Sequence, residues 1–152
     1  MNQNISVIGA GTMGTGIAQV ASTYGCSVNL IDNAPEVLNR SKSNLQSILN
    51  RLVEKGKISK TDSVNVFSQI KWSNKIEDVL DSKLVIEAVI ENMELKQQIF
   101  AKIESLVSNT CIIATNTSSL SVTEIASICS NPSRVLGIHF FNPAPIMKLV
   151  EV

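Results

Sequence analysis

The chain contains a single histidine, His139, in the stretch GIHFFNPAPIMKLVEV. Glu151 follows twelve residues later, and two prolines between them favour a turn over a continuing strand. If the chain folds back as a plain hairpin with Asn142 opposite Lys148, then His139 faces Glu151 with their Cβ atoms about 5 Å apart. A register slip of one residue would undo this pairing.

A histidine beside a carboxylate can act as a general base. The carboxylate of Glu151 would fix the tautomer of His139 and stabilise its imidazolium, while the imidazole removes a proton from a substrate hydroxyl. Next to a nicotinamide, loss of that proton drives hydride transfer from the carbinol carbon. The alternative is a histidine on a sheet edge and a solvated glutamate, and the residue types alone favour neither interpretation.

A glycine-rich stretch, VIGAGTMGTGIA, supplies Gly9, Gly11 and Gly14 directly after an apolar run and at the start of a helical pattern. In a dinucleotide-binding turn, Gly9 allows the sharp bend, Gly11 lets the backbone approach a pyrophosphate, and Gly14 lets helix pack against strand. The helix N-terminus then presents N–H groups to the phosphates. The alternative is a tight strand-to-helix turn that binds nothing.

Asp32 ends the second apolar run, 18 residues after Gly14. A carboxylate at this place can accept hydrogen bonds from both hydroxyls of an adenosine ribose, and it would repel a 2′-phosphate. The next residues are Asn33 and Ala34, so no arginine stands ready for NADP. The sequence therefore predicts NAD, and a helix-capping role for Asp32 is compatible with this interpretation.

The elements that must position these residues alternate between strand and helix patterns. Several strand candidates are continuously apolar, as in parallel strands covered on both faces. This alternation predicts an α/β, doubly wound, mostly parallel sheet of the Rossmann type, ending in a C-terminal hairpin. Strands are expected at residues 5–8, 27–31, 70–72, 84–89, 111–114 and 135–141, and helices at 13–24, from 33–35 to about 52, and at 92–107.

The composition limits the other classes of function. With 152 residues, 44% of them hydrophobic, the chain has the material for one domain over residues 1–152. Thirteen basic residues balance thirteen acidic ones, so neither nucleic acid nor a membrane surface is an expected partner. No apolar run approaches the ~18 residues of a membrane span. Cys26, Cys111 and Cys129 are odd in number and far apart, which predicts no disulfide framework, no metal site and a cytoplasmic location.

Four stretches together resemble one family. The chain is similar to the N-terminal domain of the short-chain L-3-hydroxyacyl-CoA dehydrogenases, and most of all to the bacterial 3-hydroxybutyryl-CoA type. The resemblance implies NAD as cofactor and an acyl-CoA thioester as substrate. It is carried, in this order, by VIGAGTMGTGIA, LVIEAVIENMELKQQIF, ATNTSSLSVTEIA and GIHFFNPAPIMKLVEV.

The resemblance also implies roles for single residues. His139 matches the catalytic base, Glu151 its partner, and Ser118 a serine that contacts the substrate hydroxyl. Lys55 and Lys57 lie where the family has a helical arm near the CoA phosphates, and they are weaker candidates for that site. The cofactor-binding positions implied are Gly9, Gly11, Thr12, Met13, Gly14, Asp32, Ala88, Glu91, Lys96, Asn116 and Asn142.

Plainer interpretations exist beside these. Glu91 and Lys96 also fit an ordinary solvated helix start, and residues 116–119 fit a turn that caps the next helix. Members of the family continue into a mostly helical C-terminal domain that supplies dimer contacts and much of the acyl-CoA site. This chain is therefore expected to be the NAD-binding catalytic part, weakly active alone. We expect it to form a homo-oligomer or to bind a partner chain that supplies the second domain. The alternative is an isolated NAD-binding module with little or no turnover, like a crystallin relative.

Overall fold

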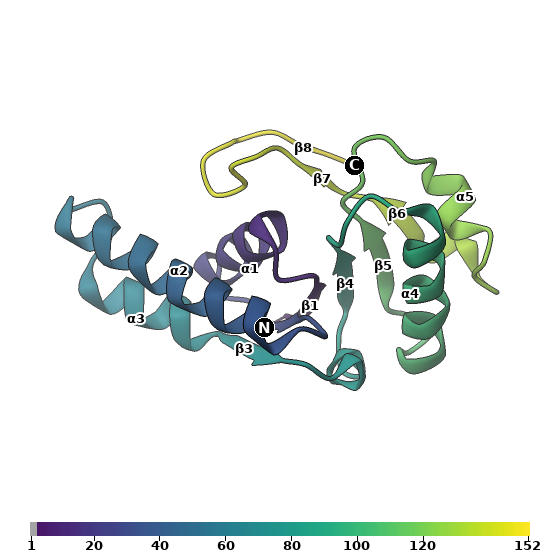
Figure 1. Ribbon diagram of the computed structural model, residues 1–152, viewed down its shortest axis with the longest axis horizontal. Helices are drawn as coiled ribbons and strands as arrows, with labels where there is room; N and C mark the ends of the chain where they lie inside the picture. The colour runs from purple at the N-terminus through teal and green to yellow at the C-terminus, as the bar shows by residue number, and fades with distance from the viewer. Residues whose placement is uncertain (1–2) are drawn as a thin grey trace.

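Six parallel strands form one sheet in the computed structural model, which describes residues 3–152 (Figure 1). The order across the sheet is β3-β2-β1-β4-β5-β6, so the chain runs outward from β1 in one direction and then, starting again at β4, in the other. This is the doubly wound arrangement that the sequence predicts. The strands are β1 (Asn4–Ile8), β2 (Ser27–Ile31), β3 (Ile70–Ser73), β4 (Leu84–Glu87), β5 (Ile112–Thr115) and β6 (Val135–Gly137).

The helices cover the sheet on both faces. The described helices are α1 (Thr12–Thr23), α2 (Pro35–Glu54), α3 (Lys60–Ser68), α4 (Met93–Leu106) and α5 (Val122–Ala126), with short 3₁₀ turns at Ile76–Val79 and Pro132–Arg134. In Figure 1, α1, α2 and α3 lie on one side of the sheet and α4 and α5 on the other. Among the described residues, none of these helices combines the length and the apolar character required to cross a bilayer.

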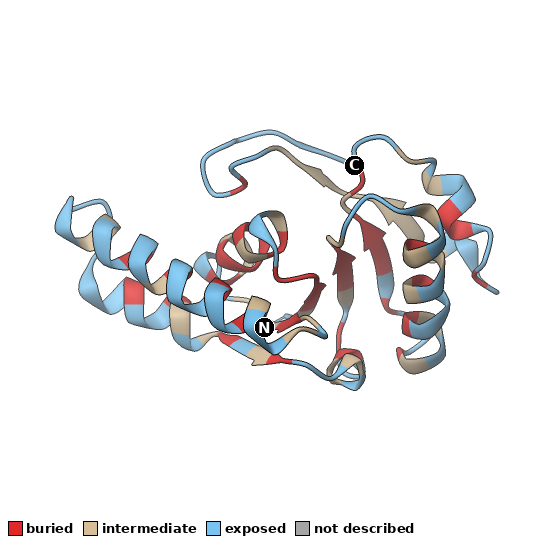
Figure 2. Ribbon diagram, in the orientation of Figure 1, coloured by how far each residue is buried: buried red, intermediate tan, exposed pale blue. Residues whose placement is uncertain are grey.

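Two hydrophobic cores follow from the alternation of side chains along the strands. On β1, Val7 packs into the core under α1, α2 and α3, whereas its neighbour Ile8 packs into the core under α4 and α5. Leu45 of α2 and Phe100 of α4 are fully buried in the first and second core respectively. Figure 2 shows the central strands buried between the helix layers. Continuous apolar runs were a sound predictor here because both faces of each strand are covered.

The expected strand at residues 135–141 is two strands. β6 ends at Gly137, and β7 (His139–Phe140) leaves the large sheet to pair antiparallel with β8 (Val150–Glu151). The physical reason lies in the neighbouring strand: β5 ends at Thr115, so beyond the bond from Ile138 N to Thr115 O the main sheet offers no partner. The expected strand at 84–89 likewise ends at Glu87, where the chain turns.

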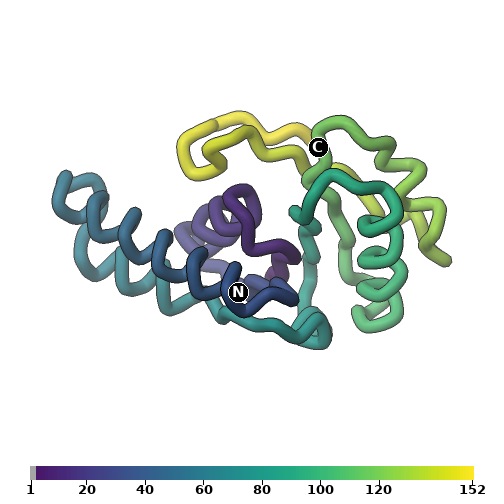
Figure 3. Tube along the Cα trace, in the orientation of Figure 1, coloured from purple at the N-terminus to yellow at the C-terminus, as the bar shows by residue number. Residues whose placement is uncertain are grey.

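The hairpin register agrees with the sequence analysis. His139 pairs with Glu151 and Phe140 with Val150, as a plain hairpin requires. The loop of this hairpin passes over α1 (Figure 3), and a Cβ added at Gly16 would meet Ala144 Cβ at 3.2 Å. Ala144 is buried in this contact. The hairpin is therefore anchored to the same helix that begins at the glycine-rich turn.

Candidate functional site

The carboxyl ends of the parallel strands meet at one edge of the sheet. Gly9 follows β1, Asp32 follows β2 and Ala88 follows β4. Backbone bonds from Gly9 N to Ile31 O (2.7 Å) and from Ala88 N to Ile8 O (2.8 Å) hold these turns together. The direction of winding reverses between β1 and β4, and a crevice at that point is where open α/β sheets bind ligands.

The reason for having glycine differs among the three glycine positions of the turn. Gly9 has φ +102°, and a Cβ there would lie 2.6 Å from Ala88 O. A Cβ at Gly14 would lie 1.7 Å from Gly9 O, so helix and turn could not pack. A Cβ at Gly11 would meet no atom within 4 Å. The fold thus requires glycine at Gly9 and Gly14, while Gly11 borders open space that a ligand could fill.

That open space is a groove of about 720 Å³. Gly9, Gly11 and Asp32 border it, together with the backbone that follows β4. The first turn of α1 has no side-chain cap and no acidic residue, so it can receive an anionic group. The apolar lining would suit a flat ring such as adenine, and it comes from Ile8, Ile31, Ala34, Val37, Ile76, Ala88, Val89, Ile90, Leu95 and Ile99.

Asp32 joins two turns at the mouth of this groove. Its Oδ2 accepts a hydrogen bond from Ala10 N at 2.8 Å, and its Oδ1 accepts one from Ala34 N at 3.0 Å. The bond to Ala34 N closes a turn just before α2, but no side chain caps that helix, so the helix-capping role considered for Asp32 is not observed. Each carboxylate oxygen keeps capacity for a further donor, such as a ribose hydroxyl.

The hairpin brings the histidine and its carboxylate together. His139 Nδ1 lies 2.9 Å from Glu151 Oε2, with 24% of the histidine side chain and 61% of the glutamate side chain exposed. The ring of Phe141 lies beside the imidazole, with ring centroids 4.5 Å apart. Because Nδ1 faces the carboxylate, Nε2 is the nitrogen that can receive a substrate proton. A bond from Phe140 N to Asn116 Oδ1 (2.9 Å) ties the hairpin to the turn after β5.

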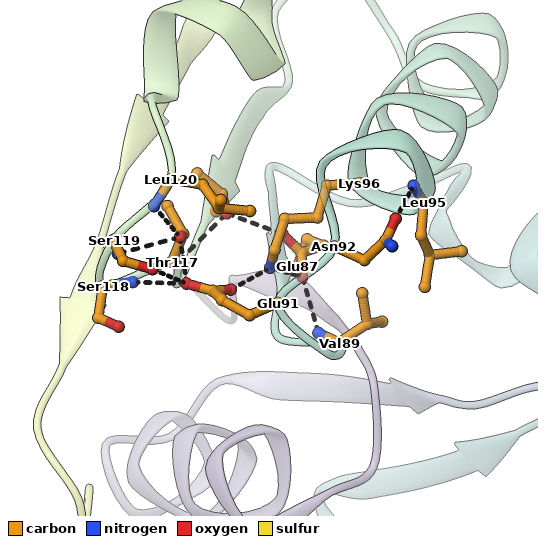
Figure 4. A network of polar contacts seen from close by, with 11 residues as sticks. Glu87, Val89, Glu91, Asn92, Leu95, Lys96, Thr117, Ser118, Ser119 and Leu120 are labelled. Carbon is orange, nitrogen blue, oxygen red and sulfur yellow. Dashed lines mark hydrogen bonds and ion pairs between the residues drawn. The ribbon is translucent and has the colours of Figure 1, made fainter.

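A buried charge network lies between β4 and α4 (Figure 4). Lys96 is 1% exposed, and its Nζ lies 2.7 Å from Glu87 Oε1 and 3.1 Å from Glu91 Oε2. Glu91 also accepts hydrogen bonds from Thr117 Oγ1 and from Ser118 N. Partial burial acts to raise the pKa of Glu91, but the bonds from Thr117, Lys96 and Ser118 lower that pKa to about 2. The alternative of an ordinary solvated helix start is therefore wrong for Lys96.

Some of the remaining residues predicted from the sequence lie near the carboxyl edge of the sheet, and others lie far from it. Ser118 is exposed, and Figure 4 shows its side chain pointing away from Glu91. Thr12 and Met13 begin α1, and Asn142 begins the hairpin loop. Lys55 and Lys57 are exposed in the turn between α2 and α3, at the end of that helix pair far from the sheet (Figure 1). The structure does not bring these two lysines to the groove.

Three residues of the network were not predicted from the sequence, namely Glu87, Thr115 and Thr117. Glu87 is fully buried, and Thr115 Oγ1 donates to its Oε2 at 2.7 Å. Thr117 is also buried, and its Oγ1 accepts a hydrogen bond from Leu120 N at 3.0 Å. One signal was available: a glutamate inside the apolar run LVIEAV needs a buried partner.

Comparisons with known proteins agree with this geometry. The family model described as 3-hydroxyacyl-CoA dehydrogenase, NAD binding domain, matches residues 4–152. The 3-hydroxybutyryl-CoA dehydrogenase of Clostridioides difficile is 43% identical over 148 residues, covering 97% of this chain and 53% of that protein. A Bacillus subtilis protein named as a probable 3-hydroxybutyryl-CoA dehydrogenase is 43% identical over 99% of this chain and 52% of its own length.

Solved structures give the same result. The crystal structure of the Escherichia coli 3-hydroxybutyryl-CoA dehydrogenase superposes with a TM-score of 0.96 at 41% identity, covering 99% of this chain and 32% of that one. The Ralstonia eutropha enzyme PaaH1 has a TM-score of 0.95 at 38% identity, covering 99% of this chain and 53% of that one. The chain spans about half the length of the curated relatives that it matches. It belongs to the 3-hydroxyacyl-CoA dehydrogenase family, of which it is the NAD-binding domain.

Proposed function

We propose that this chain is the catalytic NAD-binding part of a dehydrogenase that oxidises 3-hydroxyacyl-CoA thioesters, in particular 3-hydroxybutyryl-CoA. The observation that carries the proposal is the contact of 2.9 Å between His139 and Glu151, on a hairpin anchored to the helix of the glycine-rich turn. The names of the similar dehydrogenases support the choice of substrate.

The groove suits NAD. The space beside Gly11 admits a pyrophosphate, the uncapped start of α1 offers N–H groups to it, and Asp32 can accept the ribose hydroxyls. When bound, NAD⁺ supplies the hydride acceptor for the carbinol carbon of the substrate. The residues that would hold it are Gly9, Gly11, Thr12, Met13, Gly14 and Asp32 on the adenosine and pyrophosphate side, and Ala88, Glu91, Asn116 and Asn142 toward the nicotinamide. Lys96 is buried behind Glu91, so we assign it support rather than direct contact.

The histidine handles the proton. His139 Nε2 takes the proton of the substrate hydroxyl, and Glu151 holds Nδ1 and stabilises the imidazolium that forms. Without this charge partner the imidazolium is less favourable, and the base is weaker in the transition state. The exposed hydroxyl of Ser118 orients the substrate hydroxyl, in accord with the family resemblance.

Other parts of the proposal concern the whole protein. Residues 1–152 act as one NAD-binding domain, and a helical domain, on the same or a partner chain, completes the acyl-CoA site. Lys55 and Lys57 meet the CoA phosphates from the end of the α2–α3 pair. The chain forms a homo-oligomer and works in the cytoplasm, where its cysteines, all free thiols, would stay reduced. This chain alone turns over acyl-CoA slowly, because hydride transfer needs the reacting carbon held within about 1 Å of its productive position.

The second candidate is an NAD-binding module without useful turnover. It is favoured by one observation, namely that the groove is lined by residues such as Gly11 and Asp32 but not by His139 or Glu151. Titration with NADH and NADPH, followed by assay with acetoacetyl-CoA and NADH, decides between the two. The assay is run with and without the helical half of a relative added in trans.

We expect NADH to bind more tightly than NADPH, and turnover to appear on adding the helical half. Turnover should be nearly abolished in His139→Ala and strongly lowered in Glu151→Gln, with NADH affinity kept in both variants. Binding without turnover in any combination would support the module, and no NADH binding by the parent would overturn both.

A further inference from the structure

Glu87 is a buried carboxylate that neither the cofactor nor the proton transfer uses. It is the last residue of β4, and its side chain is 0% exposed. Its Oε1 accepts hydrogen bonds at 2.7 Å from Lys96 Nζ and from Val89 N, and its Oε2 accepts one at 2.7 Å from Thr115 Oγ1. These contacts of its side chain lie inside the protein, directly beside Ala88 and Val89, which line the groove.

Stability of the fold does not by itself explain a buried pair of charges. Taking Glu87 and Lys96 out of water is costly, and well-packed apolar side chains of similar size often serve a fold equally well or better. What a fully hydrogen-bonded ion pair provides is a fixed geometry. Lys96 Nζ forms one ion pair with Glu87 Oε1. It forms a second ion pair, at 3.1 Å, with Glu91 Oε2.

Glu91 carries that geometry into the loop after β5. Its Oε1 accepts hydrogen bonds from Thr117 Oγ1, from Ser118 N at 3.0 Å and from Ser119 Oγ at 3.3 Å. Thr117 Oγ1 in turn accepts from Leu120 N at 3.0 Å. The backbone of residues 117–120 is thus held by a side chain from the turn just before α4, and Figure 4 shows the contacts of Thr117, Ser118 and Ser119 converging on Glu91.

The same loop holds the residues that would meet cofactor and substrate. Ser118 lies in it, and Asn116 at its start accepts the Phe140 N–H beside His139. A second connection runs from Glu87 through Thr115, whose Oγ1 also accepts from Thr117 N at 3.2 Å. Glu87 is therefore linked to the loop by two routes, one through Thr115 of β5 and one through Lys96 and Glu91.

We propose that Glu87 is a positioning residue, which acts through Lys96 and Glu91 to fix the loop at residues 116–120 for the cofactor and for His139. This inference rests on the proposed function. It differs from a structural role, because a structural ion pair changes the unfolding temperature and leaves the folded site unaltered.

The test replaces the ion pair by an apolar pair of similar size, Glu87→Leu with Lys96→Met. The matched control removes another ion pair, Lys71 with Asp78 (3.0 Å), by Lys71→Met with Asp78→Leu. Neither control residue borders the groove. Three quantities are measured in this chain: the unfolding temperature, the amide hydrogen exchange rates of Ser118 and Leu120, and the dissociation constant of NADH.

The Glu87→Leu/Lys96→Met variant should stay folded, with both amides exchanging at least about tenfold faster and NADH binding at least about fivefold weaker than in the parent. The control variant should match the parent in the exchange rates of both amides and in its affinity for NADH. A folded Glu87→Leu/Lys96→Met variant with parental exchange and parental NADH affinity overturns the proposal. Failure of the parent to bind NADH instead sinks the proposed function, and the exchange rates still decide whether Glu87 fixes the loop.

If the apolar pair fails to fold, Thr117→Val tests the same connection without disturbing the buried charges. Its side chain has the same shape, but it can neither donate to Glu91 nor accept from Leu120 N, so only the exchange of Ser118 reports on Glu91. Faster exchange at Ser118 together with weaker NADH binding supports the proposal. Parental values for both show that the loop keeps its place without the bond between Thr117 and Glu91, and they overturn the proposal.

Discussion

Gly11 is the residue whose environment most directly indicates a ligand. Glycine is required at Gly9 by its positive φ and at Gly14 by the nearby carbonyl of Gly9, but no atom of residues 3–152 crowds Gly11. Its backbone, at φ −69° and ψ −171°, is one that any residue adopts. Glycine there is explained by the need for close approach of a pyrophosphate.

Substitutions at these glycines should therefore separate stability from binding. Gly11→Val should fold with a free energy of unfolding within about 0.5 kcal/mol of the parent, yet bind NADH at least about tenfold more weakly. Gly14→Ala should lose about 3 kcal/mol of stability, because its Cβ would meet Gly9 O at 1.7 Å. Urea unfolding and NADH fluorescence titration measure the two effects. Parental NADH affinity in Gly11→Val would show that no ligand occupies this space.

Glu91 gives the chain a defined response to acid. Its pKa is lowered from 4.5 to about 2 by hydrogen bonds that include those of Thr117 and Lys96, which outweigh its partial burial. A lowered pKa means that ionised Glu91 stabilises the folded state fully above pH 4.5, and that this contribution is lost as the pH falls toward 2. The free energy of unfolding of the parent should thus exceed that of Glu91→Gln above pH 4.5 by a constant amount. Urea unfolding between pH 7 and 2 should show the difference shrinking only below that pH, and a difference independent of pH would contradict the assignment.

Some of this residue chemistry could be predicted from the sequence and some could not. The pairing of His139 with Glu151 follows from local turn geometry, because two prolines and a plain hairpin leave few registers. The burial of Lys96 could not be predicted in the same way. Its partner Glu87 lies on β4, whereas Lys96 lies on α4. The periodicity of a helix does not predict which side chain of a neighbouring strand its residues will contact.

At the scale of elements, the hairpin of β7 and β8 is the part that the large sheet does not hold. Its fixed points are the Asn116 bond to Phe140 N and the contact of its loop with α1. The sequence predicts the turn but not this docking, since the contact depends on a small residue, Gly16, in the middle of a helix. Helix α3 was not among the helices expected from the sequence. The sequence does contain a signal for its start, because Ser59 and Asp62 form a capping box.

Crowding the helix face under the hairpin should loosen the hairpin without changing the glycine turn. A side chain at Gly16 would press on Ala144 Cβ and on Pro145 Cδ, at 3.2 and 3.3 Å from its Cβ. Gly16→Val should cost about 1–3 kcal/mol of stability and speed the amide exchange of Phe140. Gly16→Ala combined with Ala144→Gly should restore the slow exchange. If Phe140 exchanges at the parental rate in Gly16→Val, the contact with α1 does not hold the hairpin.

At the scale of the whole molecule, apolar surface is unevenly distributed. The residues of the two hydrophobic cores are buried. The hairpin, in contrast, carries exposed apolar side chains that are close together in sequence, and Figure 2 shows its loop largely exposed. Thirteen basic and thirteen acidic residues leave no net charge to keep copies apart. The exposed hairpin residues are Ile146 (72%), Met147 (44%), Leu149 (57%), Val150 (38%) and Val152 (91%).

This apolar strip should make the chain self-associate. Contiguous exposed apolar side chains on a protein with no net charge favour contacts between copies, because covering them removes apolar surface from water. Sedimentation velocity over a range of concentrations should show the average mass rising with concentration. Leu149→Glu should weaken the association by about tenfold or more, since a charge replaces an apolar contact. Tyr24→Glu, which changes an 85% exposed aromatic residue at the end of α1, should leave it unchanged. A parent that stays monomeric at every concentration, or equal loss in both variants, would show that the hairpin surface is not the site of contact.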